Sequence, residues 1–307
     1  AAQSSPSVAD SSPFRPLDLP APNTIRTGSG RPGRDYWQQR ADYRISATLT
    51  PDNQELVGRE TIHYVNHSPD RLPYLWLHME QNICEPGSDT NQLDQPPPVF
   101  PGSAFDFSCK GGRGGITLEK LTHLGKPLSH TVYGTTMRVD LPTPLAAGAS
   151  IDLDLAWRFV VPEQGAGRMG RDGTLYELGQ WYPRVAVYDD VKGWNHEPYI
   201  GAGEFYLEYG SFDVSVTLPA AYTVAATGRL LNPLEVLTAK QRARLLKAKV
   251  SDTAVAIITA DEAGNPALSR PKQSGTLTWR FHADSVRDFA FAAAPNFRWD
   301  ASAWDGI

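Results

Sequence analysis

The chain has 307 residues, of which 41% are hydrophobic and 21% are charged, and its formal net charge is −5. This length is enough for one large domain or two ordinary domains, each with a buried core. A net negative charge gives no reason to expect a nucleic-acid partner, because polyanion binding usually needs a basic face. No apolar run approaches the roughly 20 residues of a membrane-spanning helix, so we expect no transmembrane segment.

The N-terminal segment, residues 1–35, is rich in Ser, Pro, Gly and Ala and holds few large apolar side chains. Such a segment buries too little surface to offset the entropy lost on ordering it, so we expect a flexible leader. The chain begins Ala1-Ala2-Gln3 without Met, as after removal of a signal peptide, although a shortened chain would begin in the same way. We therefore expect a periplasmic or secreted protein.

From Tyr36 onward, apolar and polar residues alternate in many short runs. Successive side chains of a strand point to opposite faces, so a period of two indicates strands with one face on a core and one in water. The sequence therefore predicts a mostly β domain over residues 36–300, built of antiparallel sheets as a large saddle or sandwich. The clearest runs are residues 45–49, 56–66, 74–79, 137–141, 151–157, 212–218 and 277–281.

One segment has the composition of a helix. Residues 238–250 begin with Thr238, a favourable N-cap residue, and continue mainly with the strong helix formers Ala, Lys, Gln, Arg and Leu. The Lys and Arg side chains would face solvent or an acidic neighbour. We predict one short surface helix here, inserted between strands.

The two cysteines, Cys84 and Cys109, flank a loop rich in Pro and Gly. In an oxidising compartment they could close this loop as a disulfide, whereas in the cytosol they would be buried thiols. Neither cysteine belongs to a C-x-x-C motif, so a redox or zinc role is not expected. For an exported protein we predict the disulfide.

The histidines do not form a metal-binding motif. His63 and His67 are four residues apart, which on a strand separates them by about 13 Å. His196-Glu197 begins like H-E-x-x-H, but Ile200 replaces the second His, and Pro198 is incompatible with a helix interior. There is also no G-x-S-x-G nucleophile motif. The sequence therefore predicts no catalytic residue and no metal site in this chain.

Residues 176–209 combine carboxylates, an amide and aromatic rings more densely than any other segment. Aromatic faces beside carboxylates suit a sugar, paired carboxylates could hydrolyse a glycoside, and the same acids could bind Ca²⁺. The plainer interpretation is loops whose aromatic rings pack on the sheet while the acids face water. The polar residues are Glu177, Gln180, Asp189, Asp190, Glu197, Glu204 and Glu208.

Several stretches follow one another in the order in which a known family has them. They are Gly179-Gln180-Trp181-Tyr182-Pro183-Arg184, Tyr188-Asp189-Asp190, Gly203-Glu204-Phe205 and residues 212–219, and before them residues 36–40, 56–58, 62–69 and 75–77. Residues 286–291 match the strand that closes the first domain of that family. Over residues 36–300 the chain thus resembles the N-terminal domain of the gluzincin zinc aminopeptidases, the metallopeptidase family of aminopeptidase N and leukotriene hydrolase, in its bacterial branch.

The resemblance implies a parent enzyme that removes residues from the N-termini of peptides. In the family, H-E-x-x-H and a downstream Glu hold zinc, and a G-x-M-E-N loop holds the free amine. None of these motifs occurs in this sequence. We therefore expect a non-catalytic N-terminal domain that has no cofactor, shapes the substrate cleft and is inactive alone. Zinc would belong to a catalytic remainder of the same protein, with residues 301–307 starting the linker to it.

The resemblance also implies one substrate-binding residue. In relatives, a polar side chain at the position of Gln180 lines the pocket for the first residue of the substrate. An amide both donates and accepts hydrogen bonds, so it can orient an α-amine or a backbone carbonyl. We predict Gln180 as a contact for a peptide substrate.

Two other classes of protein remain open on the sequence, both free-standing β-domains without catalysis. A carbohydrate-binding domain would expose Trp181 and Trp194 as a platform for a sugar. A protein-binding module would use a sheet edge and hold no small ligand.

Overall fold

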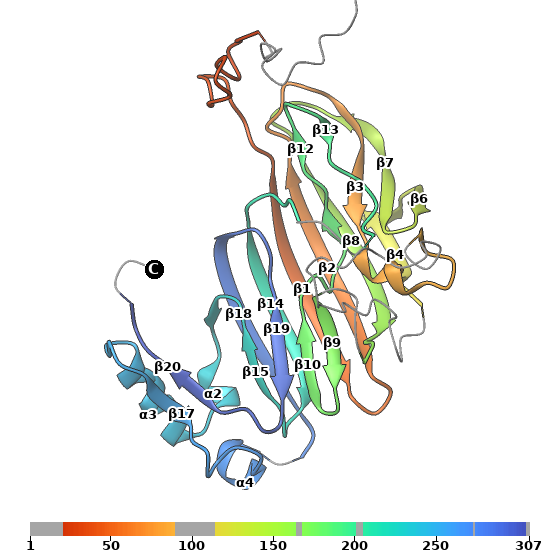
Figure 1. Cartoon of the computed structure of the whole chain (residues 1–307). Coiled ribbons are helices and arrows are strands. Elements are labelled where there is room, and N and C mark those ends of the chain that lie inside the picture. The colour runs from red at the N-terminus through yellow and green to blue at the C-terminus, as the bar shows by residue number, and fades with distance from the viewer. Residues whose placement is uncertain (1–20, 90–113, 164–167, 201–204, 273, 305–307) are drawn as a thin grey trace, which may run out of the picture. The chain divides into compact units, whose positions relative to one another are not determined.

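The computed structural model describes residues 21–89, 114–163, 168–200, 205–272 and 274–304 (Figure 1). The chain divides into two compact units, residues 1–37 and residues 38–307. In the first unit, a β-bridge joins Arg26 to Pro32, and the Arg26 guanidinium lies 5.1 Å from the centre of the Tyr36 ring. All the strands and helices named below belong to the second unit.

The second unit is built on an eight-stranded sheet in the order β16-β18-β14-β1-β2-β8-β4-β5. The pairing of β1 with β14 is parallel, and all the other pairings in this sheet are antiparallel. Its strands are β1 (Arg40–Thr50), β2 (Glu55–Val65), β4 (Thr117–His123), β5 (Lys126–Pro127), β8 (Ser150–Val160), β14 (Gly210–Pro219), β16 (Arg229–Leu230) and β18 (Thr276–Val286).

The long strands bury one face, as the alternation of residues predicted. In β1, Tyr43, Ile45 and Ala47 are buried, while the residues between them are exposed. The interior is closely packed at Gly58 of β2, where a β-carbon would lie 2.2 Å from the ring of Trp157. Trp157 itself has no exposed surface, so this glycine allows the indole to cross the strand.

Two four-stranded sheets share one hydrophobic core with the large sheet, and Figure 1 shows β9, β10, β15 and β19 in front of the large sheet. The fold is therefore mostly β and layered, which confirms the predicted fold class. One small sheet contains β15 (Thr223–Ala226), β19 (Phe291–Ala294), β10 (Leu175–Leu178) and β9 (Met169–Asp172), and the other β11 (Arg184–Val185), β3 (Leu72–His78), β7 (Thr136–Leu145) and β6 (His130–Tyr133). Two-stranded ribbons pair β12 (Tyr188–Asp189) with β13 (Gly193–Trp194) and β17 (Val255–Ile258) with β20 (Trp299–Ala301).

The predicted helix is present as α3 (Ala239–Ala248). Thr238 is its N-cap, and a capping box links the Thr238 side chain to the backbone N–H of Gln241 while the Gln241 side chain binds the Thr238 N–H. The expected acidic neighbour is Glu262, whose carboxylate lies 2.5 Å from Arg244.

The described residues contain more helices than the single one that the sequence predicted. Two four-residue helices, α2 (Pro233–Val236) and α4 (Pro266–Ser269), flank α3, and a 3-10 helix, η1 (Glu80–Cys84), follows β3. Both α2 and α4 begin with Asn followed by Pro, an N-terminal signal that was overlooked. No helix among the described residues is long and apolar enough to cross a membrane.

The match of residues 286–291 to a single strand was wrong. Strand β18 ends at Val286, residues 287–290 form a connection, and β19 begins at Phe291. The chain leaves the sheet here because Asp288 accepts hydrogen bonds from Tyr182 and from the backbone N–H of Phe289. Cys109 lies outside the described residues, so the disulfide with Cys84 stays a prediction.

Candidate functional site

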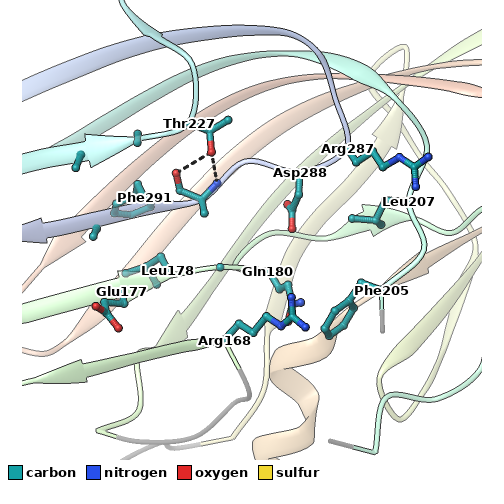
Figure 2. A pocket seen from close by; sticks show the side chains of 15 residues that line it. Arg168, Glu177, Leu178, Gln180, Phe205, Leu207, Thr227, Arg287, Asp288 and Phe291 are labelled. Atoms are coloured by element: carbon teal, nitrogen blue, oxygen red, sulfur yellow. Dashed lines mark hydrogen bonds between the residues drawn. The ribbon is translucent and has the colours of Figure 1, made fainter. Parts of the chain in front are cut away.

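A cavity of about 680 Å³ opens over the sheet formed by β15, β19, β10 and β9 (Figure 2). Its walls come from these strands, from the connection before β19 and from the segment before β14. The lining residues are Arg168, Glu177, Leu178, Gly179, Gln180, Phe205, Leu207, Ala225, Ala226, Thr227, Arg287, Asp288, Ala290, Phe291 and Ala292. The predicted residue Gln180 is therefore part of a concave surface.

The floor of this cavity carries very small side chains. Across the strands, Ala225 pairs with Ala292, Ala292 with Glu177, and Glu177 with Gly170. Glu177 is exposed, so its carboxylate projects from a row that otherwise contains only Ala and Gly. Small residues in a sheet allow another chain or a ligand to approach the backbone closely. This part of the sheet therefore leaves room for a polypeptide, with the Glu177 carboxylate at one side of it.

Gln180 is held in an unfavourable conformation at the edge of this floor. Its φ is +55°, in the left-handed region that non-glycine residues rarely adopt, and only 4% of the residue is exposed. Its backbone carbonyl accepts a hydrogen bond from Gln81 Nε2. Its own Oε1 is enclosed without a hydrogen-bond partner. An unpaired buried acceptor costs about 1–3 kcal/mol, so the surrounding packing must impose this arrangement.

A buried ion network fixes the segment that carries Gln180. The Arg184 guanidinium, 1% exposed, pairs with Glu80 at the start of η1 and with Asp288, whose Oδ2 is 2.9 Å away. Tyr182 donates a hydrogen bond of 2.7 Å to the same Asp288. Burial alone would lower the pKa of Arg184, but the two carboxylates raise it above its usual value. The network ties together η1, β11 and the connection before β19.

Phe205 lies in the cavity wall between two guanidinium groups. Arg168 and Arg184 each lie 5.3 Å from the centre of its ring. Figure 2 shows Arg168 beside Gln180 and Phe205, on the side of the cavity away from Thr227. One end of the cavity therefore combines the Phe205 ring, the Arg168 guanidinium and Gln180, while Arg184 lies buried behind the ring.

The two tryptophans that a carbohydrate-binding domain would have to expose are buried. Trp181 has no exposed surface and donates a hydrogen bond of 2.9 Å to the Phe289 carbonyl, and Trp194 is 7% exposed. Trp181 packs edge-on against Trp157 and Phe291. Neither indole offers a face to a ligand, so the carbohydrate-binding alternative lacks the platform that it requires.

The other acids of residues 176–209 do not converge on one point. Asp189 Oδ1 accepts hydrogen bonds from the backbone N–H groups of Val191 and Lys192, which is a turn motif. Glu197 pairs with Lys192 at the surface. Glu204 lies outside the described residues. The described acids therefore support loop structure, and no paired carboxylates for glycoside hydrolysis are assembled.

The histidines are also engaged separately. His63 is 2.6 Å from Asp152, His67 is 2.7 Å from the Gln38 carbonyl, and His196 stacks on Trp76 at 4.2 Å. Within the described ranges, no three His, Cys, Asp or Glu side chains are grouped as metal ligands. His196-Glu197 lies in an irregular segment rather than on a helix.

One carboxyl group beside the cavity titrates near neutral pH. Burial raises the pKa of Glu208 from 4.5 to about 7, although the backbone N–H of Gln39 and the charge of Arg287 oppose the shift. The folded protein thus holds this proton more tightly than the unfolded chain. The group therefore stabilises the fold fully below pH 4.5, and its contribution is lost as the pH rises through about 7.

We expect the Glu208→Gln variant, which does not titrate, to gain stability relative to the original protein as the pH rises through this range. Urea unfolding at a series of pH values measures the difference in unfolding free energy. Parallel pH profiles of the two proteins would show that Glu208 does not have this raised pKa.

Comparisons with known proteins find similar structures only. No family model matches the sequence, and no curated protein matches it. A two-domain M1 zinc metallopeptidase bound to L-tryptophan is similar over 86% of this chain and 44% of its own, at 13% identity and a TM-score of 0.43. An M1 zinc metallopeptidase from Deinococcus radiodurans is similar over 86% of this chain and 43% of its own, at 13% identity and a TM-score of 0.43.

A variant of the Deinococcus radiodurans enzyme bound to a Tyr-Ser-Ala substrate is similar at 14% identity and a TM-score of 0.43, over 84% of this chain and 42% of its own. The chain therefore spans less than half the length of these structures. These structural neighbours are all M1 zinc metallopeptidases.

Proposed function

We propose that this chain is the non-catalytic N-terminal domain of a zinc-dependent aminopeptidase and that the sheet carrying Gln180 forms one wall of the substrate cleft. The observation that carries the proposal is Gln180 itself. It lies in the motif that resembles the family, it is 4% exposed at the wall of a 680 Å³ cavity, and it is held at a positive φ. Strained residues of this kind cluster at functional sites.

The surroundings of Gln180 suit the end of a peptide. The small side chains of Ala225 and Ala292 leave room for a backbone, and the Glu177 carboxylate can attract an α-ammonium group. The Gln180 amide can donate to a peptide carbonyl or accept from an amine. In this proposal the chain contributes shape and hydrogen bonds, while zinc and the reacting groups belong to a catalytic domain of the same protein.

We place the protein in the periplasm or outside the cell. Support comes from its sequence, in which Cys84 and Cys109 could close the loop between them in an oxidising compartment. Alkylation of the unreduced protein is expected to add no mass, and alkylation after reduction should modify both thiols. Two reactive thiols without reduction would count against export.

The role of Gln180 is tested by steady-state kinetics of the natural protein on aminoacyl-anilide substrates. We expect Gln180→Ala to raise KM about tenfold, because one hydrogen bond to substrate is worth roughly 1–1.5 kcal/mol. Gln180→Asn, which tolerates a positive φ and keeps an amide, should be affected less.

Gln54 provides a matched control, because its φ is also positive, at +57°, and it lies in the turn between β1 and β2. Gln54→Ala makes the same change of side chain at a positive φ outside the cavity and should leave KM unchanged. Equal kinetics for both Ala variants would remove Gln180 from the substrate site. Peptidase activity of the 307-residue chain alone in the presence of zinc would contradict the non-catalytic assignment.

A further inference from the structure

A second unusual group lies far along the chain from the Gln180 segment, in the excursion between β16 and β18. This excursion contains α2, α3, β17 and α4, and Figure 1 shows these elements together with β20 beside the end of the sheet. Arg270 follows α4 directly and is 2% exposed. None of its three side-chain nitrogens has a hydrogen-bond partner. A buried guanidinium without a hydrogen-bond partner is rare, because an uncompensated buried charge is costly.

The neighbour of Arg270 is a second unsatisfied donor. The guanidinium lies 5.6 Å from the centre of the Trp279 ring on β18. Trp279 has no exposed surface, and its indole Nε1 is also enclosed without an acceptor. A guanidinium offers five N–H groups and an indole one, and neither can accept a hydrogen bond. The two side chains thus bring donors and one positive charge into the same enclosed region.

The carboxylates of the excursion do not supply the missing acceptor. Glu262 binds Arg244 at 2.5 Å and accepts from the Thr259 backbone N–H. Glu235 binds Arg280 and Asn232. Asp252 and Asp261 are exposed and so remain in water.

The charge is not removed by deprotonation either. Burial lowers the pKa of Arg270 to about 10, so the guanidinium is still protonated at neutral pH. Water could satisfy single N–H groups, but it carries no compensating charge. A small anion would satisfy both the donors and the charge.

We infer that Arg270 and Trp279 form a buried binding site for a small monovalent anion of the size of chloride, which holds α4 to β18. The anion accepts from the guanidinium and from the indole N–H at once. Binding to the folded state alone stabilises a protein in proportion to the logarithm of the ligand concentration. At constant ionic strength, the stability of this chain should therefore depend on which anion is present.

Thermal unfolding of the full chain tests this inference, with chloride exchanged for methanesulfonate at constant ionic strength. At saturation chloride is expected to raise the Tm by about 5 °C. Arg270→Met should lose this response and be no less stable than the original protein without chloride, because it removes an uncompensated buried charge. Trp279→Phe should need several-fold more chloride for the same rise.

Arg242 provides the control, since its guanidinium lies in the same excursion and already donates to the Leu237 carbonyl at 2.6 Å. Arg242→Met should keep the full chloride response. Crystals grown with bromide should give an anomalous peak within hydrogen-bond distance of the Arg270 guanidinium. The inference is overturned if chloride does not raise the Tm of the original protein, or if it still raises the Tm of Arg270→Met. It is also overturned if the crystals show water and no bromide beside the Arg270 guanidinium.

Discussion

Replacing Arg184 by methionine is expected to lower the free energy of unfolding by about 3–5 kcal/mol. The substitution keeps the length of the side chain but removes the charge that Glu80 and Asp288 share. Glu80 is 2% exposed, so its carboxylate would remain in the interior without a counter-charge. Breaking a buried ion pair from one side is costly for this reason, even where the intact pair adds little net stability.

Arg158 is the matched control for this experiment. It also bridges two carboxylates, Glu55 and Glu119, each at 3.0 Å, but it does so at the solvent-exposed side of β8. Exposed ion pairs contribute little, so Arg158→Met should change the unfolding midpoint in urea only slightly. If the two variants lost the same free energy of unfolding, burial would not explain the contribution of the Arg184 network to stability.

The second large effect is expected for Trp181→Ala, which should destabilise the fold by about 3–5 kcal/mol. The indole has no exposed surface and contacts Trp157, Tyr182 and Phe291, so its removal leaves a cavity in the core. The Phe289 carbonyl would also lose its donor. Because Phe289 belongs to the connection beside Asp288, the loss should loosen the wall of the Gln180 cavity as well.

A second variant separates the hydrogen bond of Trp181 from its ring contacts, and a surface tryptophan provides a control. Trp181→Phe keeps most of the ring contacts and loses the hydrogen bond, which should cost about 1–3 kcal/mol. Trp304, which is 77% exposed, serves as the surface control, and Trp304→Ala should leave the unfolding curve unchanged. Loss of glycan binding in a Trp181→Ala protein of unchanged stability would contradict this account and restore the sugar-platform interpretation.

The strands could be predicted from the sequence because a half-buried strand repeats every two residues. β2, β8 and β14 lie within three residues of the predicted runs, whereas β1 begins at Arg40, five residues before the predicted run of residues 45–49. Helices α2 and α4 were missed because four residues give too little periodicity to recognise. Their Asn-Pro starts were the only local signals.

Gln180 could be proposed from a motif, but its surroundings could not. Glu80 and Asp288 each lie 104 residues from Arg184 along the chain, and no local pattern indicates that they meet. The small residues meet in the cavity floor because of the register between β15, β19 and β10. The alternation of apolar and polar residues along a strand does not determine that register.

Composition also failed to separate buried from exposed aromatic residues. Trp181 and Trp194 were compatible with a sugar platform as long as only their types and spacing were known. Trp181 is buried because its indole packs against Trp157 and Phe291 in the core. A dense group of aromatic residues is therefore weak evidence for a binding surface until burial is known.

The most direct test of the central proposal is the intact mass and zinc content of the natural protein purified from its source. We predict a single polypeptide well above the 33.7 kDa of this chain, carrying about one zinc ion, because the catalytic motifs belong to another part of the same protein. A natural protein of 33.7 kDa without zinc would contradict the proposal and make this chain a free-standing β-domain.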